Sequence, residues 1–127
     1  MKRYLLDTNV ILRFLLQDHK KYYEIASEYF RKAQHKQIEL GIIPEVLFEL
    51  DYVLRGVYHL SKTEVVDILS KLIKTPYINI KNRGLILTII EEYQKKTIDL
   101  FDIYLFYLAK NEKSEVISFD RDFKKLK

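Results

Sequence analysis

Apolar residues at helical spacing dominate the chain. Spacings of three and four residues place side chains on one face of a helix. Ser61 and Glu64 form a capping-box pattern at the start of one helix, and Pro44 suits the first turn of another. The pattern predicts helices over 20–37, 44–58, 61–72, 85–93 and 100–109, the last apolar almost all round, and a largely buried segment over 10–16.

Short apolar runs lie between these helices and predict strands over 4–6, 38–43, 76–80 and 115–119. Strands that alternate with helices form a parallel sheet covered on both faces. The chain has no repeat, no low-complexity segment and only three Gly and two Pro. We therefore predict a single domain over 1–127 of the α/β class, with three α/β/α layers. Its short parallel sheet has four strands, or five if a further edge strand forms.

Composition narrows the possible chemistry. The absence of cysteine excludes disulfides, thiolate nucleophiles and Cys-ligated zinc. The histidines, His19, His35 and His59, are scattered and receive no ligand role. The net charge of +4 favours an anionic partner such as nucleic acid, although it fits a solvated basic surface equally well. No signal peptide and no apolar stretch of about 18 residues is recognisable, so we expect a cytoplasmic protein without a membrane partner.

Two aspartates directly follow predicted strands. Asp7 ends the first apolar run and Asp120 the last one. Active sites of parallel sheets lie at the carboxyl ends of the strands, which favours a functional role. An Asp at such a point also caps helices, and for Asp7 the two interpretations are evenly matched. Asp122 follows two residues later, and one of this pair could cap a closing helical turn.

Other acids lie within predicted helices. Asp102 is the only charge in the apolar segment 100–109, where a carboxylate needs a cation, a cap or hydrogen bonds. Asp99 precedes it and suits an N-cap. Glu45 and Glu49 share one helix face. We expect Glu45 to be solvated and Glu49 to lie nearer the buried side.

Carboxylates from four separate elements repel one another unless a hard cation neutralises them. Mg²⁺ and Mn²⁺ prefer oxygen ligands, and Mg²⁺ keeps waters that can become nucleophiles. This is the chemistry of metal-dependent phosphodiester hydrolysis. No Ser-His-Asp or Cys-His arrangement competes with it, and Asn9 stands where an aspartyl phosphatase would need its second Asp.

Four blocks in this order resemble the PIN domain, most closely the toxin ribonucleases of the VapC type. They are 5–10 (Leu-Leu-Asp-Thr-Asn-Val), 46–54 around Glu49, Asp102, and 116–123 (Val-Ile-Ser-Phe-Asp-Arg-Asp-Phe). The resemblance implies a metal-binding and catalytic quartet of Asp7, Glu49, Asp102 and Asp120. It also implies a supporting role for Asn9, Ser118 in place of a usual threonine, and Asp122 as an auxiliary acid.

The same resemblance implies Mg²⁺ or Mn²⁺ as cofactor, an RNA substrate, a homodimer and a cognate antitoxin protein. The chain departs from the family pattern at Ile103, Leu105 and Phe106, where small residues are usual, and it lacks a glycine in 113–115. Two alternatives stay open. One is a noncatalytic PIN-like module that binds RNA or protein, and the other is a housekeeping PIN nuclease.

Aromatic residues gather on the first predicted helices. Tyr22, Tyr29 and Phe30 lie on the apolar stripe of 20–37, while Tyr52 and Tyr58 lie on the Glu49 helix. Aromatic side chains are enriched in interface cores. Internal packing explains any one of them equally well. Together with the family resemblance, they suggest a homodimer with an apolar groove for an antitoxin segment.

Overall fold

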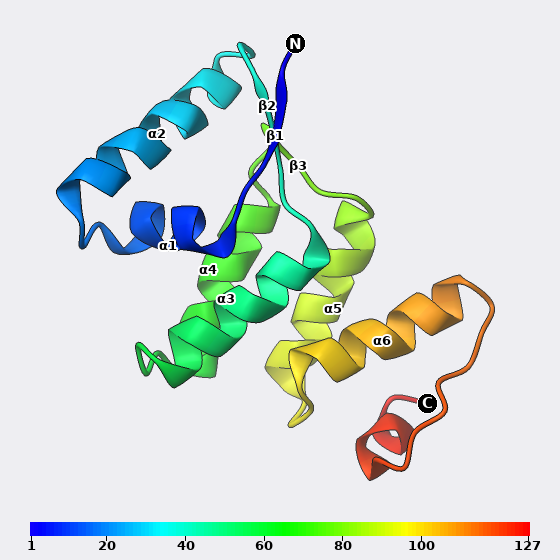
Figure 1. Ribbon diagram of the computed structural model, residues 1–127. Helices are drawn as coiled ribbons and strands as arrows, with labels where there is room; N and C mark the ends of the chain where they lie inside the picture. The colour runs from blue at the N-terminus through cyan, green and yellow to red at the C-terminus, as the bar shows by residue number, and fades with distance from the viewer.

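The computed structural model describes residues 1–127 as helices around a small sheet (Figure 1). Helix formation follows the sequence pattern closely. The Ser61 hydroxyl accepts a hydrogen bond from the Glu64 backbone, the Glu64 carboxylate accepts one from the Ser61 backbone, and Pro44 occupies the first turn of its helix. The elements are β1 (Arg3–Leu5), α1 (Thr8–Leu16), α2 (Lys20–Gln34), β2 (Glu39–Gly41), α3 (Pro44–Gly56), α4 (Lys62–Ile73), β3 (Ile78–Asn79), α5 (Arg83–Lys95), α6 (Leu100–Asn111) and the 3₁₀ helix η1 (Arg121–Lys125).

The sheet is parallel and has three strands in the order β1-β2-β3. Leu40 of the central strand pairs with Tyr4 on one side and Ile78 on the other. Gly41 suits this position, because a Cβ there would lie 3.1 Å from the Leu5 side chain. The α/β class and the parallel sheet are therefore confirmed.

The predicted fourth strand is absent, so the expected sheet of four or five strands is wrong. Residues 115–119 form no strand, and Ile117 and Phe119 are 98% and 107% exposed. Figure 1 shows the reason: the chain after α6 lies on the side of α6 that faces away from β1, and it does not return to the sheet. A strand needs a neighbour with free backbone groups, and this segment meets none. Asp120 consequently does not lie at a strand end.

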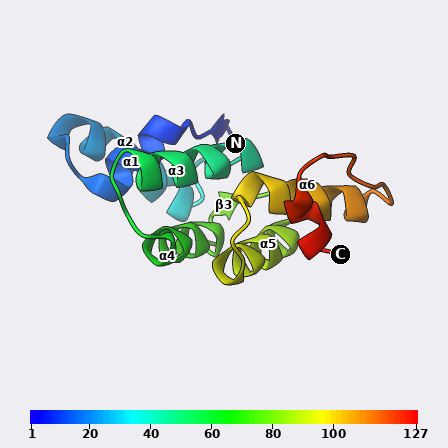
Figure 2. The same ribbon diagram turned by 90° about the horizontal axis from the view of Figure 1, so that it is seen from below.

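Helices cover the sheet on two sides. Figure 2 shows α1, α2 and α3 on one side and α4 and α5 on the other, with β3 between them. Twenty-three buried residues form one continuous core, in which Ile11, Leu50 and Ile103 are fully enclosed. None of the helices is long and apolar enough to cross a membrane.

The last long helix, α6, is less buried than its sequence predicts. Only Leu100 and Ile103 belong to the core, and Phe101 is about half exposed. The remaining apolar residues of α6 are half-buried because α6 packs at the edge of the molecule, against α3, α5 and η1. The prediction of a helix enclosed on most sides is therefore wrong.

Candidate metal centre

Three carboxylates meet where η1 packs against α6. Asp102 lies in the first turn of α6, and Asp120 and Asp122 lie at the start of η1. One carboxylate oxygen from each lies within 4.8 Å of the others. We call this group the acid cluster. It unites two of the predicted site residues, Asp102 and Asp120, with Asp122, which the sequence suggests only as an auxiliary acid.

The local turn fixes the two η1 carboxylates. Asp120 is the N-cap of η1, and its Oδ1 accepts a hydrogen bond from the Asp122 backbone N–H at 2.9 Å. The backbone N–H of Asp120 donates to the Ser118 hydroxyl, also at 2.9 Å. Phe123, buried in the same turn, anchors η1. One of the two aspartates thus caps the closing turn, as predicted, while its second oxygen stays free of that role.

The electrostatics of the cluster are unfavourable without a cation. Burial raises the pKa of Asp102, and the nearby carboxylates of Asp99, Asp120 and Asp122 raise it further. The Asp102 side chain accepts no hydrogen bond and forms no ion pair with another residue. Only Asp122 has a cationic partner, since its Oδ1 lies 3.1 Å from the Lys125 ammonium. The protein therefore gathers negative charge here that its own side chains neutralise only in part.

Asp7 lies elsewhere, directly after β1. It occupies the N-cap position of α1, but its side chain makes no capping hydrogen bond and is exposed. Asn9 is exposed in the first turn of the same helix. Both residues line a hollow of about 290 Å³ together with apolar side chains such as Tyr22 and Ile25. Asp7 is not a member of the acid cluster.

Glu49 is exposed on α3, so the expectation that it lies nearer the buried side is wrong. It is not a member of the acid cluster either. Its neighbour Phe48 packs against Phe101 and Tyr104, with ring centroids 5.5 and 4.8 Å apart. Phe101 precedes Asp102 and Tyr104 follows it by two residues, so the part of α3 next to Glu49 packs against the part of α6 that carries Asp102.

Asp99 occupies the N-cap position of α6 without a side-chain capping bond. Its predicted position is therefore right and the predicted cap is not formed. The charge of Asp99 acts instead on two other carboxylates, because it raises the pKa of Asp102 and that of Asp51.

Asp51 is not among the residues predicted from the sequence. This half-buried side chain accepts a hydrogen bond from the Tyr93 hydroxyl at 2.8 Å, and that hydroxyl in turn accepts one from Arg55. Burial raises the pKa of Asp51, whereas Tyr93, Arg55 and Lys62 lower it. These contacts connect α3, α4 and α5. The four-residue spacing of Asp51 and Arg55 on one helix face was the signal that could have revealed the pair.

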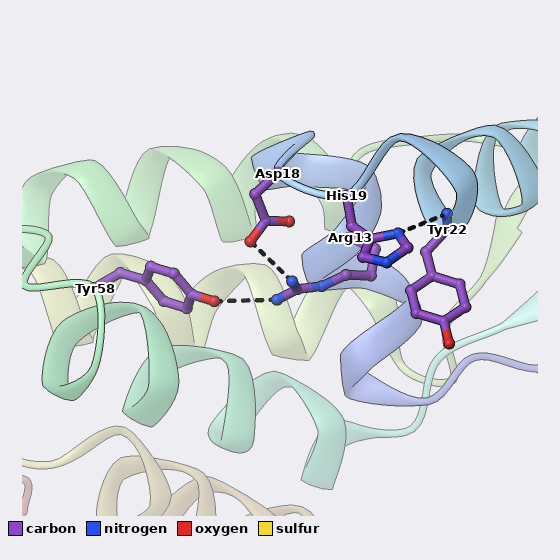
Figure 3. Close-up of polar contacts among 5 residues, drawn as sticks. All are labelled: Arg13, Asp18, His19, Tyr22 and Tyr58. Carbon is purple, nitrogen blue, oxygen red and sulfur yellow. Dashed lines mark hydrogen bonds and ion pairs between the residues drawn. The ribbon is translucent and has the colours of Figure 1, made fainter.

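Arg13 was overlooked as well. Figure 3 shows its guanidinium between Asp18 and the Tyr58 hydroxyl, at 2.8 and 3.0 Å, so that it connects the end of α1 to the segment after α3. The Tyr58 hydrogen bond and Asp18 hold the pKa of Arg13 above its ordinary value. The same view shows His19 accepting a hydrogen bond from the Tyr22 backbone, which caps α2.

The donor set of the acid cluster fits a hard divalent cation. All three groups offer carboxylate oxygen, which Mg²⁺ and Mn²⁺ prefer, and none offers nitrogen or sulfur. A cation would reverse the repulsion that raises the pKa of Asp102. The residues present are therefore suited to such a metal.

A family model described as PIN domain matches residues 4–127, nearly the whole chain. No curated protein and no solved structure gives a significant match.

Proposed function

Because the chain belongs to the PIN-domain family, we propose that it is a metal-dependent endoribonuclease. PIN domains are generally nucleases, and the observation that supports activity in this member is the acid cluster. Three carboxylates within 4.8 Å of one another, one of them half-buried and without a cationic partner, are costly to the fold. A function that needs a divalent cation accounts for that cost.

The proposed cofactor is Mg²⁺ or Mn²⁺, held by Asp102, Asp120 and Asp122. Such an ion supplies a water nucleophile at neutral pH and stabilises charge on the phosphate. By the family resemblance we assign Asp7 and Glu49 to the same acid set, with Asn9 in support.

The residues around the cluster have distinct roles in this proposal. Asp102 is held by the packing of α6, whereas the orientation of Asp120 depends on the η1 cap and the Ser118 hydroxyl. Lys125 neutralises Asp122 while no metal is bound, and it has to release that carboxylate when a metal binds. All three carboxylates must be ionised to act as ligands.

We further propose a cytoplasmic toxin of a type II toxin–antitoxin pair. The hollow lined by Asp7, Leu5, Tyr22, Ile25 and Tyr29 supports a protein partner, because the four apolar residues among these are exposed. An antitoxin segment there would place a Lys or Arg near Asp7. Helices α1 and α2, which line this hollow, are also the proposed homodimer surface. Light scattering on the isolated protein, which measures its oligomeric state, tests this proposal.

The decisive experiment is cleavage of RNA in Mg²⁺ or Mn²⁺ by the parent protein and by single variants. We expect Asp7→Asn, Asp102→Asn and Asp120→Asn to lose several kcal/mol of transition-state stabilisation. That corresponds to a rate loss of at least about a hundredfold. Glu49→Gln should show a smaller loss, because water can replace one ligand.

The matched control is Glu45→Gln, which lies one turn before Glu49 on the exposed face of α3 and should cleave normally. Undiminished cleavage by Asp102→Asn would refute the assignment. A parent protein that binds RNA but never cuts it, in either metal, would identify a noncatalytic module. Suppression of cleavage by the product of an adjacent upstream reading frame would distinguish a toxin from a housekeeping nuclease.

A further inference from the structure

A second hollow adjoins the acid cluster. It has a volume of about 560 Å³ and lies between the end of α6, the segment 113–118 and η1. Four lysines line it: Lys110, Lys113, Lys124 and Lys127. We call it the lysine hollow.

The charge of the lysine hollow is unbalanced. All four lysines are exposed, and none forms an ion pair. The only side-chain carboxylates in the lining are those of Glu115 and Asp120, so lysine ammonium groups outnumber them two to one. Unpaired lysines that surround a concave surface raise the local concentration of anions.

Asp120 joins the two features, since it lines the lysine hollow and belongs to the acid cluster. A chain-like anion bound in the hollow would therefore reach the three carboxylates of the acid cluster. A short acidic peptide would be repelled by these carboxylates. A polyanion with phosphate groups would not be repelled if a metal bound by the cluster contacts one of its phosphates.

Phe119 adds an exposed aromatic residue at the rim of the hollow: it is not in the lining, but it lies between two lining residues, Ser118 and Asp120. Phe119 is 107% exposed and stacks on no other ring. A basic groove next to an exposed aromatic ring is the usual surface for single-stranded nucleic acid, whose unstacked bases pack on the ring. Duplex bases are stacked on one another and leave no face for Phe119.

We propose that the lysine hollow binds the backbone of single-stranded RNA that leads to the acid cluster, and that Phe119 stacks on a base next to the scissile phosphate. This proposal rests on the proposed nuclease function and adds the residues of this chain that hold the substrate. Lys110, Lys113 and Lys124 contact phosphates, which makes binding salt-dependent and insensitive to sequence.

The test is fluorescence anisotropy with a labelled single-stranded RNA of about 12 nucleotides, titrated in EDTA at several salt concentrations. Without divalent ions the RNA stays intact, so binding is measured apart from cleavage. A triple variant, Lys110→Gln, Lys113→Gln and Lys124→Gln, should bind at least about tenfold more weakly. Its slope of log affinity against log salt should shrink by about 0.7 for each lysine removed.

The matched control is Lys2→Gln, Lys36→Gln and Lys74→Gln. It removes the same number of positive charges, from exposed lysines near the amino ends of β1, β2 and β3. Asp7 lies at the opposite, carboxyl end of β1, so these lysines are remote from the proposed site. Lys36 and Lys113 share a positive φ, 60° and 59°, so each triple changes one residue with a left-handed backbone conformation. The control should retain the parent slope.

Phe119→Leu should weaken single-strand binding about tenfold without changing the salt slope, and Phe119→Tyr should restore it. The affinity for an RNA duplex of the same sequence should be the same in the parent protein, in Phe119→Leu and in Phe119→Tyr. Equal losses in the two lysine triples would overturn the proposal, as would a normal slope in the first. Lysine-dependent binding without cleavage in Mg²⁺ or Mn²⁺ would sink the nuclease function alone. Cleavage with normal binding by the first triple would sink the lysine hollow alone.

Discussion

Two half-buried aspartates, Asp51 on α3 and Asp102 on α6, have opposite surroundings. Burial is the largest influence on both, and it raises both pKa values. Around Asp51 the next influences are the Tyr93 hydroxyl and two cations, Arg55 and Lys62, all of which favour its charge. Around Asp102 every further influence is another carboxylate.

The difference separates a structural acid from a functional one. A buried carboxylate with donors and cations around it is satisfied by the fold. One that meets only other carboxylates is satisfied by nothing in the chain, which makes it a functional candidate. Burial and a raised pKa alone would have ranked the two together; the identity of the neighbours distinguishes them.

The largest expected effect is on metal-dependent stability. A cation that binds only the folded protein should stabilise it by about 2.7 kcal/mol at about 100 times its dissociation constant. Thermal unfolding with Mn²⁺ measures this gain. It should vanish in Asp102→Asn and persist in Asp51→Asn.

Asp7→Asn sharpens the same experiment. Loss of the gain would assign Asp7 to the metal site with Asp102, as we propose, although Asp7 is not in the acid cluster. Unfolding that ignores Mn²⁺ in the parent protein would contradict the metal assignment as a whole.

A smaller effect is expected on the metal-free protein. Asp51→Ala leaves the buried Tyr93 hydroxyl without its acceptor and should lower the free energy of unfolding by about 1–3 kcal/mol. Asp102→Ala breaks no hydrogen bond and removes repulsion, so the free energy should stay unchanged or rise. Urea unfolding in EDTA measures both.

Each substitution places the same alanine inside a helix, so helix propensity does not separate them. A large destabilisation by Asp102→Ala would show that this carboxylate is structural after all.

The smallest expected effect concerns Asp99, whose charge reaches both aspartates. In metal-free Asp99→Asn the pKa of Asp102 should fall, and that of Asp51 should fall less, because Asp99 is the weakest influence on Asp51. Carbon-13 NMR titration of the carboxyl groups measures the two shifts.

The sign for stability follows from linkage. A raised folded-state pKa means that the folded protein holds the proton more tightly, so stability declines as pH rises through that pKa. The decline due to Asp102 should be smaller in Asp99→Asn. An equal shift at both aspartates would remove the electrostatic distinction between their sites.

Helices were predictable because their signals are local. The capping box at Ser61 and Glu64, Pro44 and the three-to-four spacing of apolar residues act within a few residues of each other. Residues 115–119 have an equally clear strand pattern, yet strand formation depends on a distant partner. No local signal states whether that partner is within reach.

The candidate site was predictable in part for the same reason. Asp102 stood out as the one charge in an apolar helix, whereas Asp120 was singled out because it follows a predicted strand that does not form. The relation between them depends on how η1 docks on α6, which sequence spacing does not encode. Asp51 was missed because its Tyr93 partner lies 42 residues away.

The open edge of β1 has a consequence for colloidal behaviour. β1 pairs only with β2, and its other edge offers unpaired backbone groups to any strand from another molecule. The strand is only three residues long and begins at Arg3, directly after Lys2. Short length and positive charge keep two such edges apart. This protection weakens as salt screens the charge, so concentrated protein should self-associate more readily in high salt than in low.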